Sequence, residues 1–519
     1  MTTALPVADA RPVPDRRASW RLAAAAVVAG LLIAASVPPM GFWPLGIAGV
    51  ALLGALLRDR PARARALVGF VAGLGLYGVT ISWFAEFNAI GAIASMACEA
   101  SFLAAAAAVT PLGTGRRAGW VGALVLQDWV RTYIPFGGVP LGGIPLGQAG
   151  GPLVPAARLG GQLGLTLVTA LAAVAVEAAA TALLAAARSG RPIVVHRVAA
   201  MFPVVAAVAA LAVPVAGAAT PSGRVVGSVR VALVQGGGQR GLRAVASSAK
   251  RVLDAQFAAS QHIAGTVDLI VWPEDVVALD GPLATSPVRD QVGAVARDHH
   301  AALLAGVTED VAADKFRNAE VAWSPDGTVA GRFDKVHRVP FGEYVPGRWL
   351  IQHVVSLDAI PRDAIPGHGT GEVTTSAGPV GIVISFEVFF PARARSAIHA
   401  GGQVLLVPTN TASYTTTQVP AAELAADRIR AWETGRDVAM VAPTGWSAVL
   451  DSRGHVVKRS GLVVQTVVEA TIPRRTGETP YVRWGDLPAL IVAAALLGGG
   501  LGVSRPAGRV DRTVNSGKP

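Results

Sequence analysis

Charged side chains are scarce in this sequence, since Asp, Glu, Lys and Arg together make up only 15% of its 519 residues. Hydrophobic residues make up 52%, and the mean hydropathy is +0.47. This balance excludes a disordered chain and an ordinary soluble enzyme. Glycine and proline are abundant, at 59 and 35 residues, but they follow no collagen-like period, which excludes a fibrous chain. An integral membrane protein with room for a soluble domain remains.

Cysteine and lysine are also rare. The single cysteine, Cys98, excludes an internal disulfide framework. The chain has 40 arginines but only 5 lysines, so arginine is its usual cation. Where this chain has a lysine in place of its usual arginine, that position therefore suggests a need for a compact ammonium group rather than a planar guanidinium. Lys335, which follows an apolar run, is such a lysine.

The formal net charge of +11 is spread unevenly along the chain. Residues 1–217 carry a net charge of +8 and residues 485–519 carry +2, whereas the polar region 218–484 carries only +1. Because that region has no basic stripe with interleaved aromatic residues, nucleic acid is a poor candidate partner. Its histidines have neither helical pairing nor cysteine neighbours, so we expect no metal and no other cofactor.

Eight apolar segments approach the length of about 20 residues that a helix needs to cross the bilayer core. The second segment is short, and the fifth contains Asp128 and Arg131. Glu99 lies inside the fourth segment, and the sequence alone gives no account of it. The eight segments are 21–37, 42–57, 66–84, 88–110, 118–134, 163–187, 198–217 and 485–504.

Arginines in the connecting segments predict the orientation of these spans. Both terminal tails and the second, fourth and sixth loops carry clustered arginines, whereas the first and third loops carry neither Lys nor Arg. Positive residues are retained on the cytoplasmic side of a cell membrane. We therefore expect a cytoplasmic tail at 1–20 and a seven-helix membrane domain at 21–217. An extracytoplasmic domain follows at 218–484, then an eighth span at 485–504 and a second cytoplasmic tail at 505–519.

The region from 225 to 475 has a different pattern, in which short β-branched runs alternate with helical and Gly/Pro-rich stretches. Several runs are apolar on both faces, which suits a sheet that is covered on both sides. We expect an α/β layered sandwich, with a hairpin turn at Pro-Asp-Gly, 325–327. Strands are expected at 229–235, 268–272, 302–307, 321–324, 380–385, 404–408, 438–442 and 448–451, and helices at 243–264, 286–300, 391–400 and 420–434.

Polar side chains follow three of the apolar runs in this region. Glu274 follows the first, Lys335 the second, and Ser385 ends the third, with Glu387 two residues later. Active sites of α/β enzymes are commonly assembled at strand ends. A carboxylate, an ammonium group and a hydroxyl can supply a base, an oxyanion stabiliser and a nucleophile. The alternative is that each is an ordinary solvated loop residue.

Several motifs occur in a fixed order, and together they resemble the apolipoprotein N-acyltransferase family, a membrane branch of the carbon–nitrogen hydrolase (nitrilase) superfamily. The resemblance covers nearly the whole chain, because this family also has eight spans with its catalytic domain between the last two. The motifs are Val231-Ala-Leu-Val-Gln-Gly236, Trp272-Pro-Glu274, Asp334-Lys335, Pro340-Phe-Gly-Glu343-Tyr344-Val-Pro346, Pro408-Thr-Asn410 and Arg430-Ala-Trp-Glu433-Thr-Gly435-Arg436.

The resemblance implies a multi-pass α-helical membrane domain that carries an extracytoplasmic, nitrilase-like αββα sandwich with a Glu–Lys–Cys triad. Glu274 matches the general base, and Lys335 matches the lysine that stabilises the oxyanion. Glu343 matches a second glutamate that supports the site. Glu387 matches the glutamate two positions after the nucleophile, which helps to hold and close the pocket.

Two aromatic residues complete the predicted site. We expect Trp272 to pack under the Glu274 loop, with direct lipid contact as the alternative. Phe386 stands beside the nucleophile position, where the family has a tyrosine, so it supplies a ring without the hydroxyl.

The nucleophile is where this sequence departs from the family. The family has Cys-Tyr-Glu, whereas Ser385-Phe386-Glu387 stands here, and Cys98 lies inside a predicted span. A hydroxyl needs fuller help from a base than a thiol, whose pKa is about 8.5. Three interpretations remain open: a serine acyltransferase, which the retained Glu and Lys residues favour; a catalytically degenerate protein that binds lipid or lipoprotein; and an amidase-type hydrolase with water as acceptor.

For an active enzyme, the resemblance implies a two-step acyl transfer. Ser385 attacks an acyl ester of a phospholipid, and the α-amine of a diacylglyceryl-cysteine at an apolipoprotein N-terminus then takes the acyl chain. The implied partners are a phospholipid donor and a diacylglyceryl apolipoprotein acceptor, which both keep their acyl chains in the cell membrane. We expect the protein to act as a monomer.

Overall fold

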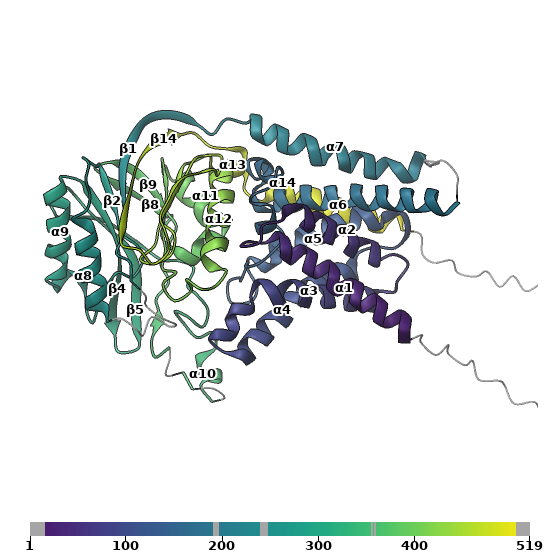
Figure 1. The fold of residues 1–519 in the computed structure, drawn as a ribbon, viewed down its shortest axis with the longest axis horizontal. Coiled ribbons are helices and arrows are strands. Elements are labelled where there is room, and N and C mark those ends of the chain that lie inside the picture. The colour runs from purple at the N-terminus through teal and green to yellow at the C-terminus, as the bar shows by residue number, and fades with distance from the viewer. Residues whose placement is uncertain (1–15, 190–196, 239–247, 354–355, 358–359, 505–519) are drawn as a thin grey trace, which may run out of the picture.

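The computed structural model describes residues 16–189, 197–238, 248–353, 356–357 and 360–504. Figure 1 shows a helical part at one end of the molecule and a part with two sheets at the other. The N-terminal end of α1 and the C-terminal end of α14 both lie on the side of the helical part that faces away from the sheets.

The helical part is built from segments at both ends of the chain. Each predicted span overlaps one of its helices. The helices are α1 (Arg16–Ser36), α2 (Trp43–Leu56), α3 (Ala62–Thr80), α4 (Ala89–Val109), α5 (Arg116–Arg131), α6 (Ala157–Ser189), α7 (Arg197–Ala219) and α14 (Leu487–Val503).

Five helical stretches are long and apolar enough to cross a membrane, by length and composition: 16–36, 62–80, 89–109, 154–189 and 201–219. Two further helices, α2 and α14, are apolar but have only 14 and 17 residues. Helix α5 has 16 residues and begins and ends with arginine. The structure therefore supports five of the eight predicted spans by this measure, and the other three remain predictions.

The buried charges of α4 and α5 pair with one another. Arg131 donates to Glu99 Oε2 at 2.5 Å and to the carbonyl oxygen of Leu141 at 2.9 Å. Asp128 accepts a hydrogen bond from the Thr166 hydroxyl at 2.7 Å. Glu99, which the sequence alone leaves unexplained, is thus the ionic partner of Arg131 between two helices.

The other part contains two sheets that face each other. The first has the strand order β14-β1-β2-β4-β5-β6, with β3 on β4 and β7 on β5, and the second has the order β13-β12-β11-β10-β9-β8. The strands of the first sheet are β1 (Arg224–Gln235), β2 (Leu269–Val271), β3 (Val277–Leu279), β4 (Ala302–Ala312), β5 (Lys315–Trp323), β6 (Val329–Asp334), β7 (Asp363–Ala364) and β14 (Thr466–Thr476). Those of the second are β8 (Glu372–Thr375), β9 (Gly378–Ile382), β10 (Leu405–Pro408), β11 (Val438–Val441), β12 (Ala448–Leu450) and β13 (Val456–Arg459).

Helices cover the outer face of each sheet, so the layers run helix, sheet, sheet, helix. Helices α8 (Ala249–Ser260) and α9 (Val288–His299) pack on the first sheet. Helices α11 (Pro391–His399) and α12 (Val419–Thr434) pack on the second, between it and the helical part (Figure 1). Two shorter helices are α10 (Arg348–Ile351) and α13 (Pro480–Trp484). The predicted αββα sandwich is confirmed.

Each predicted strand and helix of this part overlaps an observed one. The turn at 325–327 joins β5 to β6, with the Ser324 N–H donating to the Thr328 carbonyl at 2.8 Å. The predicted helix 243–264 is observed as α8, and residues 239–247 lie outside the described ranges. Six strands are not predicted from the sequence because they are very short or carry polar residues: β3, β6, β7, β8, β13 and β14.

Several predicted strand boundaries differ from the observed ones, and one of these errors falls at the predicted nucleophile. The strand expected to run to Ser385 ends at Ile382, and Ser385 instead begins a 3-10 turn, η7 (Ser385–Phe389). The backbone of Ser385 has a φ of +52°, in the left-handed region that non-glycine residues rarely adopt. A side chain with this φ cannot continue the strand, so the chain turns sharply at the predicted nucleophile.

Candidate active site

Four polar side chains meet at the end of the first sheet. The Lys335 ammonium group donates to Glu274 Oε1 at 2.7 Å and to Glu343 Oε1 at 2.9 Å. The Asn318 amide donates to the same two oxygens, at 2.8 Å each. Lys335 is only 2% exposed and Glu274 only 5%. The structure therefore brings three of the predicted site residues into one buried ionic cluster.

Backbone contacts fix Lys335 and Glu274 in this cluster. Lys335 directly follows β6, where its N–H donates to the carbonyl of Asn318 on β5 at 2.9 Å. Glu274 follows β2, and Gly306 of β4 lies directly against its backbone. A Cβ at Gly306 would lie 2.4 Å from the Pro273 carbonyl oxygen and 2.5 Å from the Glu274 Cα. Glycine is therefore required at Gly306 for the observed position of Glu274.

Glu343 reaches the cluster from a loop that closes on itself. The Val339 N–H donates to Glu343 Oε2 at 2.7 Å, and the Glu343 N–H donates to the Val339 carbonyl at 2.8 Å. The Phe341 N–H donates to the Tyr344 carbonyl at 2.8 Å. Because the backbone N–H of Val339 binds Oε2 of Glu343, the other oxygen, Oε1, is the one that accepts the hydrogen bond from Lys335.

The charges of the cluster are unequal, because two carboxylates surround one ammonium group. Burial alone would lower the pKa of Lys335, but Glu274 and Glu343 outweigh it and hold that pKa above its ordinary value. Burial raises the pKa of Glu274, an effect that Lys335 opposes. The arrangement is a charged lysine beside a carboxylate that is a stronger base than an exposed glutamate.

Glu387 connects the Lys335 segment to the Ser385 turn. Its Oε1 accepts hydrogen bonds from the N–H groups of Val336 and His337, at 2.8 and 3.0 Å. Its Oε2 accepts one from the Ile384 N–H at 2.9 Å. This fully buried carboxylate thus ties residues 336–337 to residue 384, and so brings Ser385, which is 8% exposed, next to the segment that carries Lys335.

The two predicted aromatic residues lie in different hydrophobic cores. The Phe386 ring contacts Phe390, with centroids 5.1 Å apart, in the core that includes η7. Trp272 is fully buried against α8, where its indole N–H donates to Ser260 Oγ at 3.0 Å. Trp272 therefore supports β2 from the helix layer, and its burial leaves no surface for the alternative of lipid contact.

Sequence reasoning missed three residues near the cluster. Asn318, which holds both carboxylates, lies in β5 between Arg317 and Ala319, and it had no distinct signal because Glu320 of the same strand is polar as well. Thr409 and Glu423 form a buried hydrogen-bonded pair beyond β10. Thr409 falls within the recognised Pro-Thr-Asn motif, but nothing in the sequence pairs it with a residue of α12.

Loops of the helical part contact this end of the sheets. Tyr414 packs edge-on against Trp83, with ring centroids 5.2 Å apart. The Gln418 amide donates to the Val79 carbonyl at 2.6 Å, and the Tyr344 hydroxyl donates to the Phe136 carbonyl at 2.9 Å. The cluster therefore lies at the end of the sandwich that meets the helical part.

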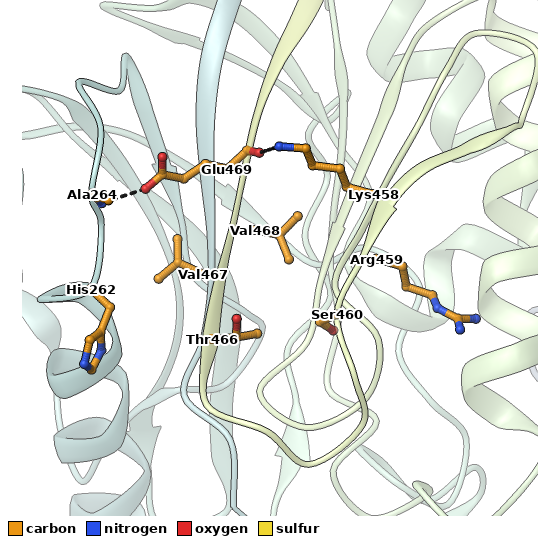
Figure 2. A pocket seen from close by; sticks show the side chains of 9 residues that line it. All are labelled: His262, Ala264, Lys458, Arg459, Ser460, Thr466, Val467, Val468 and Glu469. Atoms are coloured by element: carbon orange, nitrogen blue, oxygen red, sulfur yellow. Dashed lines mark hydrogen bonds between the residues drawn. The ribbon is translucent and has the colours of Figure 1, made fainter.

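A separate surface pocket, of about 570 Å³, lies away from this cluster between the edge strands β13 and β14. Figure 2 shows Lys458 and Glu469 joined across it, with the ammonium group donating to the Glu469 carbonyl at 2.6 Å. The Ala264 N–H donates to the Glu469 carboxylate at 2.7 Å (Figure 2). None of the predicted site residues lines this pocket, so it is not the candidate active site.

Comparisons with known families match both parts of the chain. Residues 29–175 match the model described as apolipoprotein N-acyltransferase N-terminal domain. Residues 230–481 match the carbon-nitrogen hydrolase model. The second match spans the two sheets and the candidate active site.

Comparisons with individual proteins cover nearly the whole chain. The chain is 30% identical to an apolipoprotein N-acyltransferase of Mycolicibacterium smegmatis, over 91% of this chain and 83% of the relative. It is also 30% identical to an apolipoprotein N-acyltransferase of Geobacter metallireducens, over 89% and 91%. Among solved structures, an amidase from Nesterenkonia sp. is 21% identical over 51% of this chain and 97% of that chain, with a TM-score of 0.37.

Proposed function

Because the chain belongs to the apolipoprotein N-acyltransferase family, we propose that it transfers an acyl chain from a phospholipid to an apolipoprotein. The acceptor is the α-amine of the diacylglyceryl-cysteine at the lipoprotein N-terminus. The observation that carries this proposal is the buried Lys335 ammonium group between two carboxylates, with the Ser385 turn tied beside it through Glu387.

The first half-reaction forms an acyl-enzyme. Glu274 takes the proton of the Ser385 hydroxyl as Oγ bonds to the acyl carbon of the phospholipid. Lys335 stabilises the negative charge that develops on the carbonyl oxygen. The bond from the acyl carbon to the glycerol oxygen then breaks, and that oxygen takes up a proton as the lysophospholipid leaves.

The second half-reaction transfers the acyl chain to the amine. The amine nitrogen bonds to the acyl carbon, and the bond from that carbon to Ser385 Oγ breaks. Glu274 returns its proton to Oγ, so the site regains its starting state once the amine has lost one proton. The products are the triacylated lipoprotein and the free serine.

The buried cluster supports activity despite the serine. Burial makes Glu274 a stronger base than an exposed glutamate. An alcohol nucleophile requires a stronger base than a thiol does. The sharp backbone turn at Ser385 is of the kind found where strained residues take part in function. No cofactor enters this scheme.

The expected membrane arrangement is part of the proposal. The chain is a membrane protein with several apolar helices, and we place both tails in the cytoplasm and the sandwich outside the cell membrane. The domain limits are those predicted above, with the sandwich at 218–484. At the outer surface both lipid substrates reach the site by lateral diffusion, and one chain contains every residue that the scheme uses.

Acylation of Ser385 tests the proposal. Purified protein is incubated with phospholipid and analysed by intact mass and peptide mapping, alongside Ser385→Ala and Ser385→Cys. We expect an acyl adduct on Ser385 that is absent from Ser385→Ala and that a diacylglyceryl peptide discharges. An adduct that water discharges as fast as the peptide would favour the hydrolase. No adduct except in Ser385→Cys would favour the degenerate binding protein.

A further inference from the structure

A buried carboxylic acid lies beside the candidate site and has no role in the scheme above. Glu423, on α12, is 3% exposed, and both of its carboxyl oxygens lie within hydrogen-bonding distance of Thr409 Oγ1, at 2.9 and 3.0 Å. No other hydrogen bond to this carboxyl is found within the described residues. Thr409 is itself fully buried, and its N–H donates to the Val441 carbonyl at 2.8 Å.

The elements that carry this pair pack against the turn that contains the nucleophile. Strands β9 and β10 are parallel, with Leu406 opposite Ile382. The Val383 N–H also donates to the Leu406 carbonyl at 3.0 Å, so the two segments stay paired until two residues before Ser385. The turn η7, which begins at Ser385, also contacts both β10 and α12. The Thr409–Glu423 pair thus approaches Ser385 from the second sheet, whereas Glu274 and Lys335 approach it from the first.

The charges around Glu423 differ from those around Glu274. Burial raises the pKa of Glu423 to about 8; the hydrogen bond from Thr409 opposes this rise, the charge of Glu274 adds to it, and Lys335 opposes it. Two further titratable groups face Glu423, namely Tyr414 from the adjoining loop and Asp427 on its own helix. At neutral pH Glu423 therefore holds a proton, whereas Glu274 is paired with the Lys335 ammonium group. Two carboxyl groups with different protonation states in one site can divide acid and base roles.

We propose that Glu423, acting through the Thr409 hydroxyl, protonates the leaving oxygen in the first half-reaction and receives the amine proton in the second. This inference rests on the proposed acyl transfer and assigns the proton donor that the scheme left open.

The protons balance over both half-reactions. In the first, the Ser385 proton moves to Glu274, and the Glu423 proton moves through Thr409 to the glycerol oxygen as its bond to the acyl carbon breaks. In the second, the neutral amine bonds to the acyl carbon and gives one proton to Glu423, while Glu274 returns its proton to Ser385 Oγ. Both carboxyl groups and the serine are then in their starting states.

The two half-reactions should depend on pH in opposite directions. Acylation needs protonated Glu423, so its rate should fall as pH rises through about 8, the pKa of that group. Transfer needs ionised Glu423, so its rate should rise over the same range. The acceptor α-amine also loses its proton at about pH 8 and would by itself raise the transfer rate with pH. The fall of the acylation rate, a step in which no amine takes part, is therefore the limb that reports on Glu423.

The test measures each half-reaction separately in the full-length protein in detergent. Acylation is followed by the Ser385 adduct with phospholipid, and transfer by its loss on addition of a diacylglyceryl peptide. We expect Glu423→Gln to slow acylation by phospholipid on the order of 10²-fold and to lose the alkaline limb. With an activated aryl ester, whose leaving oxygen needs no proton, the same variant should acylate at nearly the wild-type rate.

Two further variants separate the proton role from a folding defect. Thr409→Val, which keeps Glu423 but removes the hydroxyl, should show the same selective loss with phospholipid. Asp427→Asn changes another buried carboxyl, which has no hydrogen-bond partner among the described residues and lies one turn along α12. This variant should keep the wild-type rates of both half-reactions and their wild-type dependence on pH. Equal losses on both esters, or an unchanged alkaline limb in Glu423→Gln, overturn this inference alone. Absence of any wild-type adduct overturns the proposed function and this inference with it.

Discussion

Lys335 is the residue on which the charges of the site depend. It is one of only five lysines in the chain, and it is the one cation hydrogen-bonded to both Glu274 and Glu343 in the described structure. An arginine could not replace it simply, because a planar guanidinium is larger and presents its donors in a fixed fork. The rarity of lysine was therefore a usable signal for this residue.

Replacing Lys335 should abolish acylation and weaken the fold. In Lys335→Met, Glu274 would lose the cation that opposes the rise of its pKa on burial, so more of it would be protonated at neutral pH and unable to act as a base. We expect adduct formation to fall at least about 10²-fold. The free energy of unfolding should fall by about 3–5 kcal/mol, because buried charges are left unpaired. Intact mass and thermal unfolding measure the two effects.

Lys315→Met is the control for this prediction. Lys315 lies on β5 in the same sheet, but its side chain is 40% exposed and, among the described residues, pairs only with Asp314 and Asp363. Its loss should leave both the adduct and the unfolding temperature close to wild type. Wild-type acylation by Lys335→Met would show that no ammonium group is needed at the oxyanion.

The elements of the sandwich position the site through close backbone approaches. Strand β4 passes so near the Glu274 loop that its residue opposite Glu320 must be glycine, Gly306. Ser385 lies in a strained turn rather than in β9. These two local features set the distance between Glu274, the base that follows a strand of the first sheet, and Ser385, the nucleophile that follows a strand of the second.

Gly306→Ala should therefore damage the site without removing any of its side chains. The new Cβ would overlap the Pro273 carbonyl and the Glu274 Cα, so the loop must move away from Lys335. We expect at least about a 10-fold loss of acylation, since a displacement of about 1 Å can cost 10²-fold. Gly281→Ala, where a Cβ would meet no atom within 4 Å, is the matched control. Equal activity of both variants would mean that the Glu274 loop adjusts freely.

The sequence predicted those parts of the site that follow directly from strand ends and recognised motifs. Glu274, Lys335 and Ser385 each follow or end an apolar run, and this local pattern can be read without knowing the fold. Asn318 and Glu423 could not be predicted, because their importance comes from pairing between β5 and β6 and from the packing of α12 on β10. The turn at Ser385 was missed for a related reason, since the run 380–384 is apolar throughout and gives no sign of a positive φ.

At the scale of the whole molecule, an arginine at the start of α6 joins the helical part to the sandwich. The Arg158 guanidinium donates to the carbonyls of Trp432, Thr220 and Ser452, at 3.2, 2.9 and 2.6 Å. It also lies over the Trp432 ring, 4.5 Å from the centroid. Three segments far apart in the chain therefore meet at one side chain.

Arg158→Ala should loosen the contact between the two parts. The change removes the guanidinium donor from three carbonyls, and the two hydrogen bonds to Trp432 and Ser452 are buried. Each buried carbonyl that loses its donor costs about 1–3 kcal/mol when it is left unsatisfied. We expect a lower unfolding temperature in detergent and faster proteolysis at residues 220–223, which join α7 to β1. Arg188→Ala, which alters an arginine at the far end of α6, should change neither. Unchanged proteolysis of Arg158→Ala would mean that the other contacts hold the parts together.

The pairing of β1 with β14 also has a consequence for how the protein is made. These strands are the first and last of the sandwich, and they lie antiparallel along most of their length, from Arg224 opposite Thr476 to Gln235 opposite Thr466. The ribosome completes β1 long before it begins β14, so one edge of the nascent first sheet stays open while the intervening residues are synthesised. During that interval the growing chain exposes an unpaired strand that could pair with a neighbour. Synthesis of the last strand both completes the sheet and removes this aggregation hazard.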